Sequence, residues 1–124
     1  MSNSAFTYDQ NNVFARILRG EIPCAHVYED EQVLAFNDIQ PAAPVHVLII
    51  SKAPFCSVEH FLAEAGAEKI AKFFASVHKT AKHLGLSESG YRLVSNHGAT
   101  AGQSVFHFHV HLLGGEISSH LLME

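Results

Sequence analysis

Three histidines at alternate positions are the feature that most constrains the fold of this chain. His107, His109 and His111 alternate with apolar residues between Gly102 and Gly115. Successive side chains of a β-strand point to opposite faces, so a strand here places all three imidazoles on one face. The other face then carries an apolar row suited to a core, made of Phe106, Phe108, Val110 and Leu112. A helix would scatter the histidines around its circumference, so the period predicts a strand.

Length and composition predict a single globular domain. A chain of 124 residues with 48% hydrophobic and 16% charged residues can bury one core without disulfide support. The formal net charge is −4 and no cluster of Lys and Arg forms a basic patch, so we expect no nucleic-acid partner. Cys24 and Cys56 form no CxxC pair, no signal peptide is evident, and no apolar run is long enough to cross a bilayer. We therefore expect a cytoplasmic protein without membrane contact.

The expected elements are two helical regions and five strands. A short helix follows a cap at Asn11 or Asn12 and ends near Gly20. Strands are expected at residues 25–29, 33–37, 45–51 and 91–96, with the histidine strand as the fifth. Residues 59–84 predict a longer helix that Gly66 can divide in two. Its apolar stripe is made of Leu62, Ile70, Phe73, Phe74, Val77, Ala81 and Leu84.

This order of elements predicts the α+β class. The architecture is a five-stranded, mainly antiparallel sheet with a short N-terminal helix and a longer central helix. We expect a flexible N-terminal tail over residues 1–10, one domain over residues 11–115 and a C-terminal tail over residues 116–124.

Three interpretations of the histidine face are open on the residues alone. Histidines on a strand can bind a metal, with His46, His97 or His120 completing the ligands, although no Cys or Glu stands at a ligand spacing. The face can also be a solvated structural surface. The third interpretation is catalysis, because neutral imidazole attacks phosphorus and neighbouring imidazoles can stabilise phosphoryl oxygens. Three histidines in phase, preceded by a polar Gly-Gln-Ser turn, favour catalysis.

Several blocks of the chain resemble the histidine-triad family, and within it the Hint branch of nucleotide-binding proteins. Gly102-Gln103-Ser104, followed by His-x-His-x-His with apolar x, matches the family signature. Further matching blocks lie in the same order at residues 13–14, 20–23, 28–30, 34–39, 41–46 and 90–92. The likeness covers about four-fifths of the chain. It implies the HIT-like fold for the domain.

The resemblance implies hydrolysis of purine nucleoside phosphoramidates, or of acyl- or aminoacyl-adenylates, without a metal or other cofactor. By the family pattern, His109 attacks the α-phosphorus and forms a nucleotidyl-histidine, which water converts to the nucleoside monophosphate. His107 matches the position near the phosphate and leaving group, and Ser104 matches the hydroxyl that assists amine departure. Gln103 is expected to contact the phosphate. His111 and His46 match the supporting positions that orient the cluster.

The resemblance also assigns the nucleotide-binding residues. Asp38 matches the carboxylate that accepts hydrogen bonds from the ribose hydroxyls, although a turn aspartate needs no such role. Apolar side chains resemble the walls around the base, and Asn96 matches an asparagine beside the phosphate. Gly102 lets the backbone approach a ligand closely. The apolar walls are Phe14, Ile17, Phe36 and Ile39.

Relatives of this branch are homodimers with a continuous sheet, so we expect a homodimer formed by the long helix and a strand edge. Relatives also carry a basic residue and a tryptophan-containing tail after the strand that bears the triad. Here Glu116 follows Gly115 and the chain has no Trp, so the resemblance does not give the leaving-group preference. Two other activities stay open: a dinucleoside polyphosphate hydrolase of the Fhit-like branch, and a nucleotide-binding regulatory module with little turnover.

Overall fold

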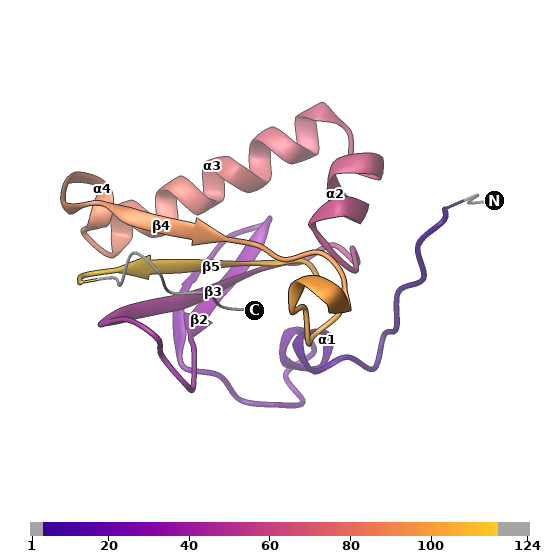
Figure 1. The fold of residues 1–124 in the computed structure, drawn as a ribbon, viewed down its shortest axis with the longest axis horizontal. Coiled ribbons are helices and arrows are strands. Elements are labelled where there is room, and N and C mark those ends of the chain that lie inside the picture. Colours follow the sequence, from indigo (N-terminus) through magenta and orange to yellow (C-terminus); the bar gives the residue numbers. More distant parts are fainter. Residues whose placement is uncertain (1–3, 117–124) are drawn as a thin grey trace.

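A five-stranded antiparallel sheet forms the centre of the computed structural model, which describes residues 4–116. The strands follow the spatial order β1-β2-β3-β5-β4 (Figure 1). They are β1 (His26–Glu29), β2 (Val33–Asn37), β3 (Val45–Ser51), β4 (Tyr91–Val94) and β5 (His109–Gly114). The helices are α1 (Val13–Leu18), α2 (Val58–Glu64), α3 (Ala67–His83) and α4 (Leu86–Ser89), with a 3-10 turn η1 (Ala99–Ala101). This architecture confirms the predicted α+β class. His120 and the predicted tail beyond Glu116 lie outside the described residues.

The short N-terminal helix α1 begins and ends as the sequence predicts. The Asn12 side chain accepts a hydrogen bond from the backbone N–H of Ala15 at 2.9 Å, which satisfies one of the donors that a helix start leaves without a partner. Gly20 follows the helix with φ +78°, a conformation that glycine adopts without strain. The helix thereby holds Phe14 against the sheet.

The central helical region divides in two at Gly66. This glycine has φ +86°, which is outside the helical range and ends the run of α2 before α3 begins. The Ser57 side chain caps α2 by accepting from the backbone N–H of His60. The short helix α4 lies in a stretch for which the sequence predicted no helix. It begins directly after Gly85, a second glycine with positive φ.

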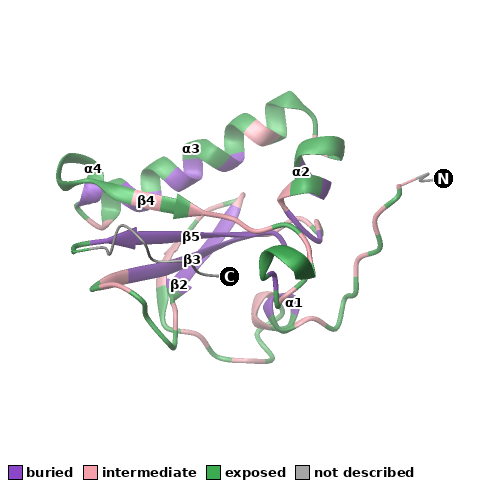
Figure 2. Cartoon of the chain, in the orientation of Figure 1, coloured by how far each residue is buried: buried purple, intermediate pink, exposed green. Residues whose placement is uncertain are grey.

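The two faces of the sheet carry two separate cores. The buried residues of β2, β3 and β5 and those of α2 and α3 appear in purple in Figure 2. On the face covered by α2 and α3, strand residues pack on Phe61, Phe73, Val77 and Ala81. On the other face, Phe14 of α1 packs on Leu34, Phe36, Leu48 and Ile50. Because strand residues alternate between faces, the same strands supply both cores.

Two residues of the predicted helical stripe lie outside the core. Leu62 of α2 and Phe74 of α3 are exposed, whereas the other members of the stripe are buried or pack against the larger core. The break between α2 and α3 at Gly66 removes Leu62 from the period of α3, whereas Phe74 lies within α3 beside Phe73, at the edge of its buried face. The stripe over residues 62–84 was therefore wrong at these two positions.

The histidine strand is shorter than its sequence period suggests. β5 begins at His109, and Phe106 is 44% exposed, so the predicted apolar row starts at Phe108. The partner strand β3 ends at Ser51, whose N–H donates to Phe108 O, and Phe108 N–H donates to Phe55 O. The chain preceding Phe108 has no further strand to pair with. Phe106 therefore lies outside the core.

Phe108 holds the start of β5 in the larger core. Its ring lies 4.5 Å from that of Phe61 in a stacked arrangement and 4.6 Å from that of Phe73. Such aromatic pairs contribute about 0.5–1.5 kcal/mol beyond their buried area. Because alternate residues face opposite sides, this anchor directs His107 and His109 to the other face.

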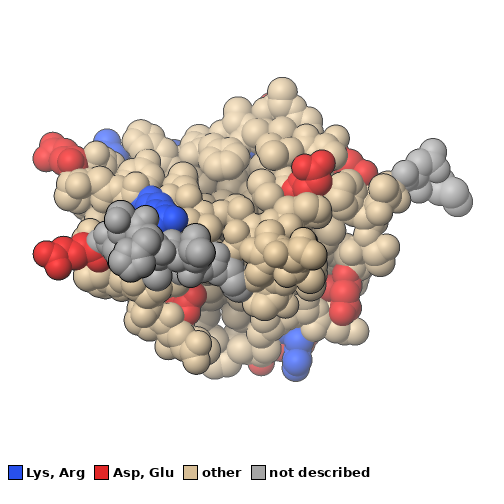
Figure 3. Space-filling model, in the orientation of Figure 1, with Lys and Arg blue, Asp and Glu red and all other residues tan. Residues whose placement is uncertain are grey.

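The surface shows acidic and basic side chains scattered around the rim of one view, with a broad uncharged face between them (Figure 3). None of the helices between residues 4 and 116 is both long and apolar enough to span a membrane.

Candidate active site

A cavity of about 460 Å³ lies on the α1 face of the sheet, where β5 meets the loop before it. Its wall contains His109, His111, Asp38 and Ser104, which brings four of the predicted site residues together. The other lining residues are mainly apolar and include Phe14, Ile17, Phe36, Ile39, Leu48 and Val105. A concave apolar site with a few convergent polar groups is typical of a small-molecule site, and its volume suits a nucleotide-sized ligand.

Hydrogen bonding fixes the tautomer of His109. Its Nδ1 lies 2.6 Å from the carbonyl oxygen of His107. A carbonyl can only accept, so Nδ1 carries the proton and Nε2 carries the lone pair. The ring also packs edge-on against Phe14, with centroids 5.0 Å apart. In the neutral ring this hydrogen bond leaves the lone pair on Nε2, which is the nucleophilic nitrogen.

His46 and His111 form a second hydrogen-bonded unit behind the cavity. The backbone N–H of Ala42 donates to His46 Nδ1 at 3.0 Å, so this nitrogen has the lone pair and Nε2 carries the proton. That Nε2–H donates to His111 Nδ1 at 3.0 Å, which in turn leaves the proton of His111 on its Nε2. Burial lowers the pKa of His46, and the carboxylate of Asp38, with Oδ2 3.4 Å from His46 Nε2, opposes this effect.

The third triad member, His107, is clamped at both ring nitrogens. Its side chain is 0% exposed. Nε2 donates to the carbonyl oxygen of Ser51 at 2.6 Å, and Nδ1 lies 2.7 Å from the Tyr8 hydroxyl. Burial lowers the pKa of His107 to about 4, so the ring is neutral at physiological pH. The sequence placed His107 near the phosphate, whereas both of its nitrogens here contact protein groups.

The four imidazoles therefore differ in where the proton lies. His46, His107 and His111 carry it on Nε2, whereas His109 carries it on Nδ1. Within the described cluster, His109 alone presents an Nε2 lone pair. The hydrogen-bond geometry thus distinguishes it from its neighbours without reference to any relative.

Asp38, His46 and His111 come close enough to be considered as metal ligands, with ligand atoms within 4.8 Å of one another. A histidine ligand coordinates through a lone pair. His46 could bind through Nε2 only if its proton moved to Nδ1, where it would face the N–H of Ala42. The tautomer observed for His46 therefore does not fit a metal at this cluster.

Gln103 connects three loop segments. Its Oε1 accepts from Gly98 N–H at 2.9 Å, and its Nε2 donates to the carbonyl oxygens of Cys56 at 2.8 Å and Val105 at 3.0 Å. The side chain is buried. The sequence predicted a phosphate contact for Gln103, but such a contact by the side chain would break one of these bonds. These bonds support the loop that carries Ser104, and the phosphate contact of Gln103 stays a prediction.

Asp38 lies between a turn and the cavity. Its Oδ1 accepts from the backbone N–H of Gln40 at 2.8 Å, which is the aspartate turn considered as the alternative to a ribose contact. Its carboxylate also lines the cavity and approaches His46. The hydrogen bond of the turn orients the side chain through Oδ1 and does not involve Oδ2. Ile39, the next residue, also lines the cavity and is highly exposed.

The cavity wall differs from the predicted set of site residues. Asn96 and Gly102 are not among its lining residues. Gly102 ends η1 with φ +95°, a left-handed conformation that glycine tolerates. Sequence reasoning missed several lining residues, which are Val13, Ile22, Pro23, Cys24, Ala25, Asn37, Leu48 and Val105. Nothing in the sequence pattern of these residues identified a ligand contact.

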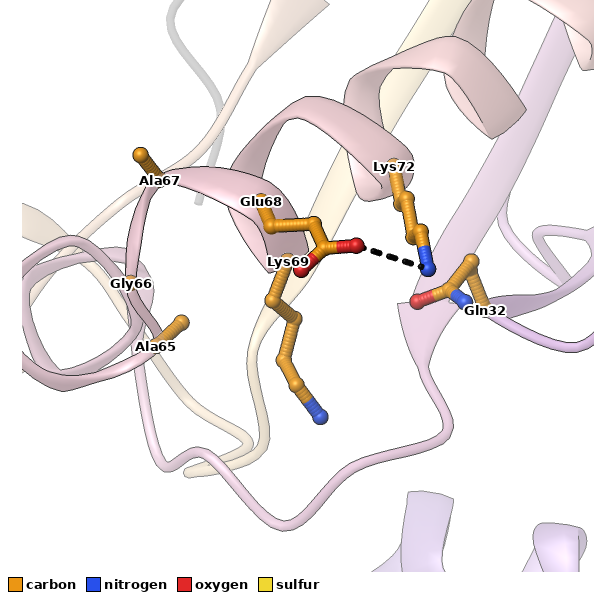
Figure 4. A pocket seen from close by; sticks show the side chains of 7 residues that line it. All are labelled: Gln32, Ala65, Gly66, Ala67, Glu68, Lys69 and Lys72. Carbon is orange, nitrogen blue, oxygen red and sulfur yellow. Dashed lines mark ion pairs between the residues drawn. The ribbon is translucent and has the colours of Figure 1, made fainter.

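A second concavity of about 450 Å³ lies at the start of α3 (Figure 4). Gln32, Glu68, Lys69 and Lys72 line it together with three small residues of the α2–α3 turn. Lys72 and Glu68 form an exposed ion pair at 3.4 Å, so opposite charges neutralise each other there. This hollow lies apart from the histidines and has no convergent catalytic groups.

Comparisons with known proteins identify the family of the chain. A family model described as the HIT domain matches residues 19–117. A 14 kDa zinc-binding protein of Zea mays is 48% identical over 108 residues, covering 86% of this chain and 84% of that protein. The purine nucleoside phosphoramidase of Escherichia coli is 41% identical over 106 residues, covering 86% of this chain and 88% of that protein.

Solved structures show the same fold. A HIT family hydrolase from Clostridium thermocellum superposes with a TM-score of 0.78 and 48% sequence identity, covering 86% of this chain and 92% of that one. Together with the family-model match over most of the chain, this similarity shows that the chain belongs to the HIT family.

Proposed function

We propose that the protein is a metal-independent hydrolase of purine nucleoside phosphoramidates or of acyl- or aminoacyl-adenylates. The observation that carries this proposal is the tautomer of His109. Its Nδ1–H is held by the His107 carbonyl at 2.6 Å, so Nε2 has a lone pair at the wall of a nucleotide-sized cavity. The name of the Escherichia coli relative supports the same substrate class.

The proposed reaction has two displacements at the α-phosphorus. In the first, the His109 Nε2 lone pair forms a bond to phosphorus, and the bond to the leaving nitrogen or carboxylate oxygen breaks with its electron pair. An amine leaving group takes a proton, for which the Ser104 hydroxyl is the proposed donor. In the second, water attacks phosphorus and gives up a proton, which restores the Ser104 hydroxyl or, where a carboxylate has left, passes to solvent; the P–Nε2 bond breaks and its electrons return to the imidazole as a nucleoside monophosphate forms.

The geometry around His109 suits the charge that develops. Attack through Nε2 makes the ring a cationic nucleotidyl-imidazolium. Its Nδ1–H already donates to the His107 carbonyl, and this hydrogen bond strengthens when the donor becomes charged. The neutral His111 beside it, with ring centroids 5.2 Å apart, adds no opposing positive charge. The intermediate is therefore stabilised by a contact already present in the resting protein.

The other residues that line the cavity are proposed to orient the substrate. We propose that the Asp38 carboxylate accepts from the ribose hydroxyls and that the apolar wall holds the purine base. That wall contains Phe14, Ile17, Phe36 and Ile39. His46 and His111 then support the phosphate side of the site through their shared hydrogen bond. Asn96 and Gly102 are proposed to reach the phosphate only through the loop before β5.

The test is release of AMP from an adenosine phosphoramidate. We expect multiple turnovers that are unchanged when a chelator is added, because no step in the proposed reaction uses a metal. AMP is separated chromatographically from substrate, with protein purified without an affinity tag to exclude metal carried by the tag. Turnover that disappears with chelator and returns with zinc would contradict the proposal.

Two alternative activities are resolved in the same assay. Faster turnover of a diadenosine polyphosphate than of the phosphoramidate would indicate the dinucleoside polyphosphate hydrolase. Tight AMP binding, measured by calorimetry, with neither turnover nor a covalent intermediate would indicate a regulatory binding module.

We further propose a homodimer formed through β4 and α3. Among the strands between residues 4 and 116, β4 pairs with β5 alone and forms one edge of the sheet. Its outward side chains Tyr91 and Leu93 are 38% and 40% exposed, and Phe74 of α3 is exposed as well. Leu93 is paired with Leu112 of the larger core, so it lies on the α3 face of the sheet. An open edge with exposed apolar side chains is suited to pairing with a second copy.

Replacing Leu93 with aspartate should convert this dimer to a monomer. A charge buried in an apolar interface without a partner is strongly unfavourable. The measurement is molar mass by light scattering across a dilution series. The matched control is Leu62→Asp, an exposed leucine on α2, which should leave the mass unchanged. A Leu93→Asp protein with the mass of the wild-type dimer would rule out this edge as the interface.

A further inference from the structure

The N-terminal segment reaches the histidine cluster through Tyr8. The Tyr8 hydroxyl lies 2.7 Å from His107 Nδ1, and the two rings meet edge-on with centroids 5.6 Å apart. Two neighbouring contacts anchor this segment: Phe6 stacks on His60 with centroids 4.5 Å apart, and Arg19 donates to the carbonyl oxygen of Gln10 at 2.7 Å. The segment predicted as a flexible tail therefore contacts the domain on both sides of Tyr8.

The direction of the Tyr8 hydrogen bond follows from the other end of the imidazole. The Ser51 carbonyl can only accept, so His107 Nε2 carries the proton and Nδ1 has the lone pair. The Tyr8 hydroxyl must then donate to Nδ1. Burial raises the pKa of Tyr8, which keeps the phenol protonated and able to donate. Both ends of the His107 ring are thereby fixed by groups from distant parts of the chain.

The same residue supplies the group that orients His109. The His107 carbonyl oxygen accepts from His109 Nδ1 at 2.6 Å. Ring and carbonyl of His107 belong to one residue that precedes β5 and lacks the regular ladder bonds of a strand. Clamping the ring therefore also restricts the position of the carbonyl. Tyr8 is therefore linked to His109 through one residue, His107, whose ring contacts Tyr8 and whose carbonyl contacts His109.

We propose that Tyr8 is a positioning residue of the hydrolytic site, which donates to His107 Nδ1 and thereby holds the His107 carbonyl against His109. This inference rests on the proposed function, because the positioned group is the proposed nucleophile. Tyr8 does not touch the reacting atoms in this scheme. Its contribution is to keep the tautomer and orientation of His109 that attack requires.

The first experiment compares Tyr8→Phe with wild type in the AMP-release assay. The phenyl ring preserves the packing on His107 and removes only the hydroxyl. We expect kcat to fall by about 3- to 10-fold, which corresponds to the loss of one ordinary hydrogen bond, with KM changed by less than about twofold. Tyr28→Phe is the matched control, since its hydroxyl bonds Asp30 away from the cavity, and it should leave both constants unchanged.

The second experiment reads the contact directly. In ¹⁵N-labelled protein, the Nδ1 resonance of His107 should move in Tyr8→Phe toward that of an imidazole nitrogen without a hydrogen bond. The pKa of His107 should rise, because the lost bond stabilised the neutral ring. Phe6→Ala, which loosens the segment and leaves the hydroxyl in place, should show the same changes with smaller amplitude.

Each combination of results decides the proposal. Reduced kcat together with the altered His107 resonance supports it. An altered resonance with unchanged kcat would show a structural contact only and would overturn the positioning role. If neither the His107 resonance nor kcat changes in Tyr8→Phe, the hydrogen bond between Tyr8 and His107 does not form and the proposal is overturned. If wild type releases no AMP while the His107 resonance still depends on Tyr8, the proposed function fails and the positioning role with it, although the hydrogen bond stands.

Discussion

Substituting His109 with alanine should lower AMP release from an adenosine phosphoramidate by at least about 1,000-fold. Removing a catalytic nucleophile commonly costs three or more orders of magnitude, because the covalent route is lost and only binding and charge stabilisation act. KM should change little, since the apolar wall and Asp38 are untouched. The loss should therefore appear in kcat.

A covalent intermediate gives this prediction a second readout. Wild-type protein mixed with substrate and quenched in alkaline denaturant should gain the mass of one nucleotidyl group, because P–N bonds are labile in acid. His109→Ala should gain none. His26→Ala, an exposed histidine on β1, is the matched control and should behave as wild type. Turnover in His109→Ala within about tenfold of wild type would assign the nucleophile to another residue.

The second large effect concerns stability at acid pH. His107 has a pKa of about 4 in the folded protein, against an ordinary value of 6.5 in the unfolded chain. Below pH 6.5 the unfolded chain therefore binds a proton that the folded protein does not, and stability is lost as the pH falls from 6.5 toward 4. The difference corresponds to about 3 kcal/mol. His46, whose pKa is also lowered by burial, acts in the same direction.

Urea unfolding at a series of pH values between 7 and 4 measures this effect. The free energy of unfolding should decrease across that range by more in wild type than in His107→Gln, in which the amide can donate to the Ser51 carbonyl but cannot titrate. Ion-paired carboxylates such as Glu29 are common to both proteins, so the difference between the two curves isolates His107. Parallel curves would show that His107 is not the titrating group.

The sequence pattern was sufficient to place the histidines on one face of a strand. Period alone separates His109 and His111 from Val110 and Leu112, and the structure has them on opposite faces. The end of that strand was not predictable from the same pattern. It depends on where β3 stops, and for that reason Phe106 lies outside the core although it continues the alternation.

The protonation pattern of the site could not be read from the sequence either. The tautomer of His107 is set by Ser51 and Tyr8, which are far away along the chain, and those of His46 and His109 depend on the folding of local backbone, the N–H of Ala42 and the carbonyl of His107. No local spacing marks these partners. Gln103 is a second example of partners that the sequence does not show. Its polar side chain before the histidines suggested a ligand contact, and in the structure it makes hydrogen bonds to three backbone groups.

The three hydrogen bonds of the Gln103 side chain affect how rigid the cavity is before a ligand binds. They join the segments at Cys56, Gly98 and Val105, so the rim beside Ser104 is assembled before any ligand arrives. A preorganised rim loses little conformational entropy on binding, and more of the contact energy then appears as affinity. The buried amide of Gln103 thus contributes to recognition through the rigidity of this rim.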